Sequence, residues 1–295
     1  MKRSLLVQLG ILIILAIIAY VVLRRPGEVS TGGSLGRMLV TYDSAAVDKI
    51  EIRSPSTSVS LENQGGRWMV TSPVNYRADE ATVASTVAAG RNIELTSLVS
   101  ANPEKRKLFQ VDSSGTMVTV YEKGKKGAAF FIGKMGSTYT ETYVRAEGSD
   151  EVYIGKGFLG ATFNRQPKEW RDRTILKTDQ NAIRSVKFQY GDTTFVLALQ
   201  DTLWRVGRDS AVYSTVKSFL GAFSNLQADE FIDTTITPTR PPVAILEAEG
   251  TQLRFYTAKD PGKYLVQTSA SPQWFEMQNW KASQILKRKK DFLPV

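Results

Sequence analysis

Apolar residues recur in this chain at one constant separation, and no other feature of the sequence restricts the fold as strongly. The separation is 136 positions, since 183 − 47 and 204 − 68 both equal 136. Apolar and other residues alternate within each run, as in half-buried β-strands. The sequence therefore predicts three strands in each of two repeats. The corresponding pairs are Val47 and Ile183, Ile50 and Val186, Ile52 and Phe188, Val59 and Phe195, Leu61 and Leu197, Trp68 and Trp204, and Val70 and Val206.

A short, nearly identical pattern follows these strands in both repeats, VASTV at 83–87 and VYSTV at 212–216. Both fit an amphipathic helix, with Asp79 as the N-cap in the first repeat and Asp209 or Ser210 in the second. The separation here is 129, since 212 − 83 equals 129, so the first repeat is expected to carry about seven extra residues before its helix. The apolar face of the second helix comprises Val212, Val216, Phe219, Leu220 and Phe223.

Alternating runs after each helix predict four further strands, joined by hairpin loops. Each repeat then ends in a charged stretch that we expect to be helical, at 167–176 and 285–293, with Arg171-Asp172 corresponding to Lys290-Asp291. The predicted strands are 117–122, 128–133, 142–146 and 151–155 in the first repeat, and 243–250, 252–257, 263–267 and 273–278 in the second.

These elements predict an α+β fold of two tandem repeats, each an antiparallel sheet with helices packed on it. Residues 45–178 form the first repeat and residues 179–295 the second, and each is long enough for its own core. The repetition of VASTV is therefore interpreted as duplicated architecture rather than as a duplicated active site.

A long apolar segment opens the chain, running from Leu5 to Leu23 with one amide and no charged side chain. A helix of this length spans about 28 Å, close to the roughly 30 Å hydrocarbon thickness of a bilayer. A cleavable signal peptide has a shorter apolar core and ends at small residues, whereas this segment ends in Arg24-Arg25-Pro26. We therefore predict a retained transmembrane anchor over residues 1–25, a flexible linker over 26–44, and a folded part outside the cytoplasm.

The chain contains no histidine and no cysteine. Imidazole and thiolate supply most structural zinc sites, haem and iron–sulfur ligands, and the base of a hydrolytic triad, so these chemistries are excluded. Neither a metal nor a cofactor is expected. Four of the 38 basic residues flank the apolar segment, which leaves 34 − 29, or +5, for the rest of the chain. That excess is too small to indicate nucleic-acid binding.

Residues 155–160, GKGFLG, fit the G-x-G-x-x-G pattern of dinucleotide-binding loops. That function requires a parallel strand–helix–strand unit, whereas the strands here are predicted as consecutive hairpins. The corresponding place in the second repeat, residues 278–281, contains no glycine. The pattern therefore favours a glycine-rich turn leading into a closing helix.

Two surfaces are candidates for contact with a partner or ligand. Tryptophan is frequent at interfaces, and the tryptophans outside the predicted central strands could form an aromatic surface, whereas Trp68 and Trp204 are expected in the core. A basic run near the end of the chain could contact lipid head groups, although an ordinary solvated face is the alternative. The residues concerned are Trp170, Trp274 and Trp280 for the first surface, and Lys287, Arg288, Lys289 and Lys290 for the second.

The motifs together resemble the domain of unknown function 4340 family. They are an N-terminal span, an Ile-x-Ile strand at 50–52, G-R-W-M-V at 66–70, Y-V-R at 143–145 and W-R-D-R-T-I-L at 170–176. This resemblance implies a bacterial envelope protein in the inner membrane, often encoded beside ATP-driven exporters of the gliding-motility type. It implies an accessory subunit and transfers no catalytic residue.

Three functions are therefore compared. The favoured hypothesis is a non-enzymatic, membrane-anchored accessory protein that acts by protein–protein contact within an export or motility complex. The alternative is an envelope module that binds a glycan or lipid in the cleft between the two repeats, because pockets often lie at domain interfaces. The third is a hydrolase that uses serine, lysine or carboxylates.

Overall fold

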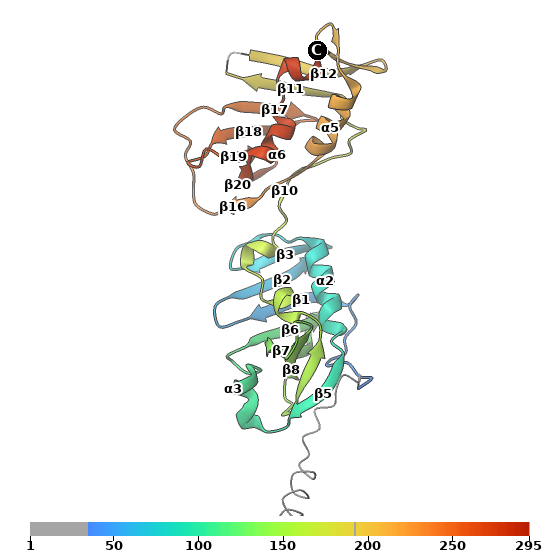
Figure 1. Ribbon diagram of the computed structural model, residues 1–295, viewed down its shortest axis with the longest axis vertical. Coiled ribbons are helices and arrows are strands. Elements are labelled where there is room, and N and C mark those ends of the chain that lie inside the picture. Colours follow the sequence, from blue (N-terminus) through green and yellow to red (C-terminus); the bar gives the residue numbers. More distant parts are fainter. Residues whose placement is uncertain (1–34, 192, 295) are drawn as a thin grey trace, which may run out of the picture. The chain divides into compact units, whose positions relative to one another are not determined.

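The computed structural model describes residues 35–191 and 193–294, and the chain divides into two compact units (Figure 1). Unit 1 ends at Trp170 and unit 2 begins at Arg171, whereas the sequence predicts the boundary at residue 178. The difference arises because strand β10 (Thr174–Lys177) pairs with β15 (Asn225–Gln227), which belongs to unit 2.

Within residues 35–170, nine strands form one antiparallel sheet in the order β4-β3-β2-β1-β6-β7-β8-β9-β5. The strands are β1 (Val47–Arg53), β2 (Ser58–Gln64), β3 (Arg67–Ser72), β4 (Tyr76–Arg77), β5 (Leu95–Ser100), β6 (Thr116–Glu122), β7 (Lys125–Met135), β8 (Glu141–Ala146) and β9 (Val152–Lys156). The helices are α2 (Glu80–Arg91), α3 (Arg106–Phe109) and α4 (Leu159–Phe163), with 3-10 turns η1 (Pro103–Lys105) and η2 (Pro167–Trp170).

The described part of unit 2 also contains a nine-stranded antiparallel sheet, in the order β14-β13-β12-β11-β17-β18-β19-β20-β16. Its strands are β11 (Ser185–Tyr190), β12 (Thr193–Gln200), β13 (Leu203–Val206), β14 (Asp209–Ser210), β16 (Glu230–Ile232), β17 (Ala244–Ala248), β18 (Thr251–Thr257), β19 (Lys263–Thr268) and β20 (Ser271–Gln278). Its helices are α5 (Tyr213–Ser224) and α6 (Asn279–Ile285), with the 3-10 turn η3 (Lys289–Phe292).

The strand orders of the two sheets correspond position by position, so the predicted duplication and the α+β class are confirmed. The hydrogen-bond register agrees as well. Ile50 lies opposite Leu61 in unit 1, and Val186 lies opposite Leu197 in unit 2. Both members of the second pair are 136 positions further on, since 186 − 50 and 197 − 61 both equal 136.

Each sheet buries one face beneath helices, because alternate residues of a strand point to the same side. In unit 1 the buried face packs against α2 and α4, and in unit 2 α6 lies on β19 and β20 beside α5 (Figure 1). A fully buried aliphatic or aromatic side chain stabilises such a core by about 1.5–3 kcal/mol. Trp68 and Trp204, expected in the core, are only half-buried, since each lies close to the hairpin turn that begins its strand, whereas Val70 and Val206 further along the same strands are fully buried.

The helices correspond in a different register from the one that VASTV and VYSTV indicate. Helix α2 begins after the N-cap Asp79 and α5 after the N-cap Val212, so the separation is 133 rather than 129, since 212 − 79 equals 133. Val83 therefore corresponds to Val216, and both are fully buried. VASTV and VYSTV are therefore offset from each other by one helical turn. The first repeat carries three extra residues before its helix rather than seven. The predicted caps Asp209 and Ser210 form strand β14 instead.

The closing stretches are not the continuous helices that were predicted. They contain the short turns η2 and η3, and strand β10 follows η2. The backbone N–H of Asp79 donates to the Trp170 carbonyl at 2.8 Å. In unit 2 the backbone N–H of Val212 donates to the Phe292 carbonyl, also at 2.8 Å. Trp170 therefore corresponds to Phe292, three positions away from the predicted alignment of Arg171 with Lys290.

Replacing Asp79 by alanine is expected to destabilise unit 1 by about 1 kcal/mol, because its carboxylate accepts the Thr82 backbone N–H at 2.7 Å and caps α2. Chemical denaturation of the full chain in detergent measures this change. Helix α5 has no side-chain hydrogen bond at its N-cap, so Val212→Ala serves as the matched control and is expected to cost less. Equal costs for the two substitutions would contradict a capping role for Asp79.

The face of each sheet opposite the helices is partly covered by the connection that leaves the edge strand. In unit 1 this connection is residues 101–115, and its Phe109 ring contacts Tyr143 at 4.7 Å between centroids. The buried Arg145 holds it by donating to the carbonyl oxygen of Val111 at 2.8 Å, and also donates to the carbonyl oxygen of Ser149 at 2.9 Å in the β8–β9 turn. In unit 2 the connection is the proline-containing segment 233–243, which has no helix.

Part of the predicted linker packs against unit 1. The backbone N–H groups of Leu35 and Leu39 donate to the carbonyls of Leu95 and Ile93, and the buried Tyr42 donates its hydroxyl to the Val87 carbonyl at 2.6 Å. The predicted membrane span, residues 5–23, lies outside the described residues. Among residues 35–191 and 193–294 no helix has the length and apolar character required to cross a bilayer.

Candidate functional site: a hollow at the same place in each unit

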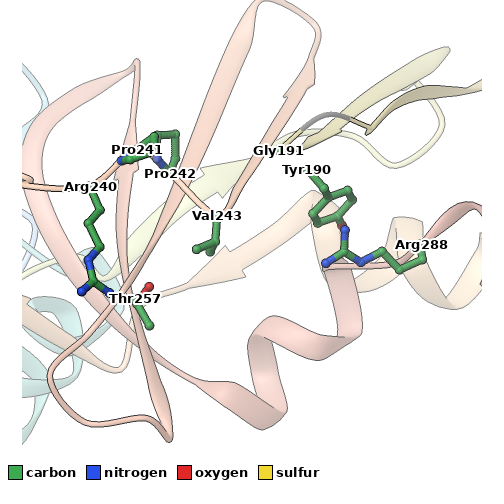
Figure 2. A pocket seen from close by; sticks show the side chains of 8 residues that line it. All are labelled: Tyr190, Gly191, Arg240, Pro241, Pro242, Val243, Thr257 and Arg288. Atoms are coloured by element: carbon green, nitrogen blue, oxygen red, sulfur yellow. The ribbon is translucent and has the colours of Figure 1, made fainter.

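Unit 2 contains a hollow of about 500 Å³ at one end of its sheet (Figure 2). Four segments line it: the end of β11, the residues that enter β17, the end of β18, and the loop after α6. We call this feature the unit 2 hollow. Its lining residues are Tyr190, Gly191, Arg240, Pro241, Pro242, Val243, Thr257 and Arg288.

Unit 1 contains a hollow of about 290 Å³, which we call the unit 1 hollow. Its walls are the β1–β2 turn, the residues that enter β6, the last part of β7, and the loop after α4. Its lining residues are Ser54, Pro55, Ser56, Thr57, Gln110, Ser114, Gly115, Thr116, Ile132, Gly133, Asn164 and Gln166.

The two hollows occupy corresponding places in the duplicated fold. Ser54 corresponds to Tyr190 at the separation of 136 shared by β1 and β11, since 190 − 54 equals 136. The loop after the small helix corresponds at a separation of 122, since 285 − 163 equals 122 for the last residues of α6 and α4. Gln166 therefore corresponds to Arg288. The duplication thus includes a recess as well as the packing of the core.

A shared hydrogen bond supports this correspondence. The backbone N–H of Gln166 donates to the Glu169 carboxylate at 2.7 Å, and the backbone N–H of Arg288 donates to the Asp291 carboxylate at 2.7 Å. Each acid lies three residues after its partner, so the loop has the same local structure in both units. The side chain that projects from it differs, an amide in unit 1 and a guanidinium in unit 2.

Arg288 is held in place by a tyrosine. Its guanidinium carbon lies 3.7 Å from the centroid of the Tyr190 ring, within the range of a cation–π contact. The Tyr190 side chain is buried and donates its hydroxyl to the Lys287 carbonyl at 2.8 Å. Burial raises the pKa of Tyr190 above its ordinary value, so the hydroxyl stays a donor well into the alkaline range.

Arg240 lies across the unit 2 hollow from Arg288. In Figure 2 Val243 lies between the two arginine side chains. Arg240 lies beside Thr257, and Arg288 lies beside Tyr190. Arg240 is exposed and precedes Pro241 and Pro242, and proline restricts the backbone of the residue before it to extended conformations. The lining of the unit 2 hollow thus includes two guanidinium groups and no carboxylate.

Sequence reasoning predicted Arg288 as a contact residue but missed Tyr190, Arg240 and Thr257. The available signal was the segment TPTRPP at 237–242, which has no counterpart in the first repeat. A proline-rich connection with one arginine, in place of a short helix, indicates that this part of the second repeat diverged from the first.

The predicted aromatic surface is not formed as a group. Trp170 is fully buried in unit 1, so its assignment to a surface is wrong, because its position is the core position that Phe292 occupies in unit 2. Trp274 is 9% exposed, lies 5.2 Å from Tyr256 between ring centroids, and lines a second hollow of about 340 Å³ beneath residues 236–241. Trp280 is 63% exposed on α6.

The four residues of the predicted basic run, 287–290, have different contacts from one another. Arg288 lines the unit 2 hollow, and the Lys287 carbonyl accepts the Tyr190 hydroxyl. Lys289 lies 3.4 Å from the Asp209 carboxylate, and Lys290 is exposed on η3. Of these four side chains, only Arg288 faces the unit 2 hollow.

The GKGFLG segment at 155–160 forms the glycine-rich turn into a helix that the sequence predicts, rather than a dinucleotide-binding loop. Strand β9 pairs in antiparallel fashion with β8 and β5, and the chain then turns at Gly157, with φ +118°, into the five-residue helix α4. A β-carbon on Gly155 would lie 2.8 Å from Ile93, so this glycine allows close packing. The parallel unit that a dinucleotide requires is not formed here.

The fold and the paired hollows define a duplicated α+β protein with a recess at the corresponding place in each repeat. A comparison with protein families matches residues 68–248 to the family described as "Domain of unknown function (DUF4340)". The match extends from β3 of unit 1 to β17 of unit 2 and covers more than half of the chain, so the chain belongs to this family, as the sequence motifs predicted. No curated protein and no solved structure matches the chain.

Proposed function

We propose that this protein is a membrane-anchored, non-enzymatic accessory subunit that acts by protein–protein contact, within an export or motility complex of the ABC type. The anchor is the apolar segment from Leu5 to Leu23, and the folded units lie outside the cytoplasm of a bacterial cell. The sequence motifs and the family membership support this placement.

A repeated exposed aromatic residue carries the proposal. Phe158 and Trp280 begin the short helices after β9 and β20, and they are 58% and 63% exposed. Their positions correspond, because Glu141 pairs with Lys156 in unit 1 and Lys263 with Gln278 in unit 2, so that 263 − 141, 278 − 156 and 280 − 158 all equal 122. A large aromatic side chain exposed at the same place in two repeats is typical of a contact surface rather than of core packing.

The decisive experiment removes both aromatic side chains. Affinity purification of the full-length protein from gently solubilised membranes is expected to recover a permease and its ATPase. The double variant Phe158→Ala, Trp280→Ala is expected to reduce that recovery at least tenfold, since a central aromatic contact typically contributes 2 kcal/mol or more. The expression level and thermal midpoint should remain unchanged, because both side chains are exposed.

Tyr213→Ala together with Leu203→Ala is the matched control, since both residues are exposed in unit 2 and neither position carries an aromatic side chain in unit 1. This control is expected to leave recovery unchanged. Equal loss in both double variants, or repeated recovery of the protein alone, would reject the proposal.

A ligand-binding function is the second candidate. The sequence placed such a site in a cleft between the repeats, whereas the observation that favours it is a recess within unit 2.

A further inference from the structure

We propose that unit 2 binds an aromatic side chain of a partner protein in the hollow of about 340 Å³ beneath residues 236–241. We call this feature the aromatic hollow. Its floor contains Tyr256, Leu265 and Trp274, and residues of the connection 233–243 form its roof.

The strand register fixes the floor of the aromatic hollow. Tyr256 on β18 lies opposite Leu265 on β19, and Trp274 on β20 lies opposite the residue two positions after Leu265. Each floor residue has a fully buried neighbour in the sequence, so the floor residues point to the face opposite the helices. These neighbours are Phe255, Val266 and Phe275. The rings of Tyr256 and Trp274 lie 5.2 Å apart between centroids, at an angle of 57°. Aromatic rings attract further rings at such distances, in tilted or edge-to-face contact.

Unit 1 fills the corresponding face with an aromatic ring of its own. Tyr143 corresponds to Leu265, since 265 − 143 equals 122, the separation that β8 and β19 share. The ring of Phe109, on the connection 101–115, packs on Tyr143 at 4.7 Å between centroids. The first repeat therefore shows which group this face of the sheet accepts, a phenylalanine side chain that approaches from outside the sheet.

The connection of unit 2 does not fill the same place. Gly133 corresponds to Tyr256, because each follows the residue that pairs with the same position of the next strand, Val144 in unit 1 and Val266 in unit 2. A β-carbon on Gly133 would lie 2.2 Å from the Phe109 carbonyl oxygen, so the connection of unit 1 lies directly on its sheet. The Tyr256 side chain excludes so close an approach in unit 2. The connection of unit 2 also contains no aromatic residue.

This connection is hydrogen-bonded only at its ends. Asp233 pairs with the buried Arg171 at 2.7 Å, and the backbone N–H of Val243 donates to the Phe255 carbonyl at 2.8 Å. Between these two points, the described residues 234–242 form no hydrogen bond, whereas a buried arginine holds the connection of unit 1 against its sheet. The roof can therefore move away from the floor without breaking a hydrogen bond, which provides a route for a side chain to enter.

The size and lining of the aromatic hollow fit a single aromatic side chain. Its volume of about 340 Å³ is near the lower limit of small-molecule sites, roughly 300–1,000 Å³. No carboxylate lines it, and the two basic side chains that do, Arg240 and Lys259, favour a ring over a cationic group. A leucine side chain would also bury apolar area, but only an aromatic ring gains the ring–ring contact that Phe109 makes in unit 1.

Nuclear magnetic resonance titration of the full-length protein in a non-ionic detergent tests the proposal with capped amino acids. The probes are N-acetylphenylalanine amide, N-acetylleucine amide and N-acetylalanine amide. The phenylalanine probe is expected to shift the indole signal of Trp274, which is identified by its loss in Trp274→Phe. It should bind about 10- to 100-fold more tightly than the alanine probe, the effect of burying one large apolar side chain, and more tightly than the leucine probe.

Ile236→Phe fills the aromatic hollow from its roof, since Ile236 is half-buried and lines it. This variant supplies the ring that Phe109 supplies in unit 1, and it is expected to weaken binding of the phenylalanine probe about tenfold or more. Thr235→Phe is the matched control, because Thr235 is exposed on the same connection and does not line the hollow. It should leave the affinity within about twofold.

The inference rests on the proposed function in that the partner is a protein, but the two are tested separately. The double variant Phe158→Ala, Trp280→Ala is expected to bind the phenylalanine probe as the unmodified protein does, so the failure of one proposal is distinguished from the failure of the other. Three results would overturn the inference: no shift of the Trp274 signal at millimolar probe, an affinity for the leucine or alanine probe equal to that for the phenylalanine probe, or equal loss in Ile236→Phe and Thr235→Phe. The comparison of probes uses the unmodified protein and does not depend on the folding of either hollow variant.

Discussion

Replacement of Trp170 by alanine is expected to lower the free energy of unfolding of unit 1 by about 3–5 kcal/mol, the usual cost of removing a large buried aromatic side chain. The indole is fully buried in the core of unit 1, and its backbone carbonyl accepts the N–H of the α2 N-cap residue, Asp79, at 2.8 Å. Hydrogen exchange of the full chain measures the change by region. We expect loss of protection within residues 35–170.

Phe292→Ala is the matched variant in unit 2, where a fully buried ring occupies the corresponding position. Its ring lies 5.5 Å from Phe219 and 5.7 Å from Phe188 between centroids, so a cost of about 3–5 kcal/mol is again expected, with loss of protection within residues 171–294. Trp280→Ala, at an exposed tryptophan, should change stability by less than about 0.5 kcal/mol. Loss of protection spread evenly through both units in either core variant would contradict separate cores.

Arg145→Met is expected to destabilise unit 1 by about 2–4 kcal/mol. The guanidinium is buried, packs 4.3 Å from the Phe131 ring centroid, and donates to the carbonyls of Val111 and Ser149. Methionine retains much of the apolar stem but removes the side-chain donor of the Val111 carbonyl, while the Ser149 carbonyl keeps only the Arg106 guanidinium at 3.3 Å. Hydrogen exchange should show the largest loss of protection in residues 101–115, the connection that Arg145 holds against the sheet.

Arg53→Met is the appropriate control, because Arg53 is also a strand arginine but its side chain is 65% exposed and contacts Glu51 at 3.1 Å. Exposed ion pairs of this kind contribute about 0–1 kcal/mol. Similar costs for the two substitutions would show that Arg145 acts only as a surface charge. Burial also lowers the pKa of Arg145, but an arginine remains charged throughout the range in which a protein is folded.

The duplication could be predicted because burial imposes the same pattern twice. Strands that bury one face require an apolar residue at every second position, so the equivalence of Ile50 and Val186 is evident from spacing alone. The helix register could not be obtained in this way. VASTV and VYSTV match in letters, but an amphipathic helix presents apolar residues again after one turn, so an alignment shifted by four residues fits nearly as well. The positions of the two N-caps, Asp79 and Val212, and the hydrogen bonds of these residues to the closing turns distinguish the two registers.

The candidate site was largely beyond prediction. Tyr190, Arg240 and Arg288 are separated by 50 and 48 positions, since 240 − 190 equals 50 and 288 − 240 equals 48, and no periodic pattern connects them. They come together because the fold brings the end of β11, the entry to β17 and the loop after α6 to one end of a sheet. Trp170 was assigned to a surface for a related reason. Residue type alone does not distinguish an interface tryptophan from a core tryptophan.

The sequence by itself determined the α+β class, the two repeats and the family, because each of these depends on local composition or on the spacing of apolar residues. The tertiary structure alone decided which helical residues correspond, where the unit boundary falls, and that each repeat has a recess at the same end of its sheet. These features depend on contacts between residues far apart in the chain, and the free energy of such contacts is not encoded in any short segment.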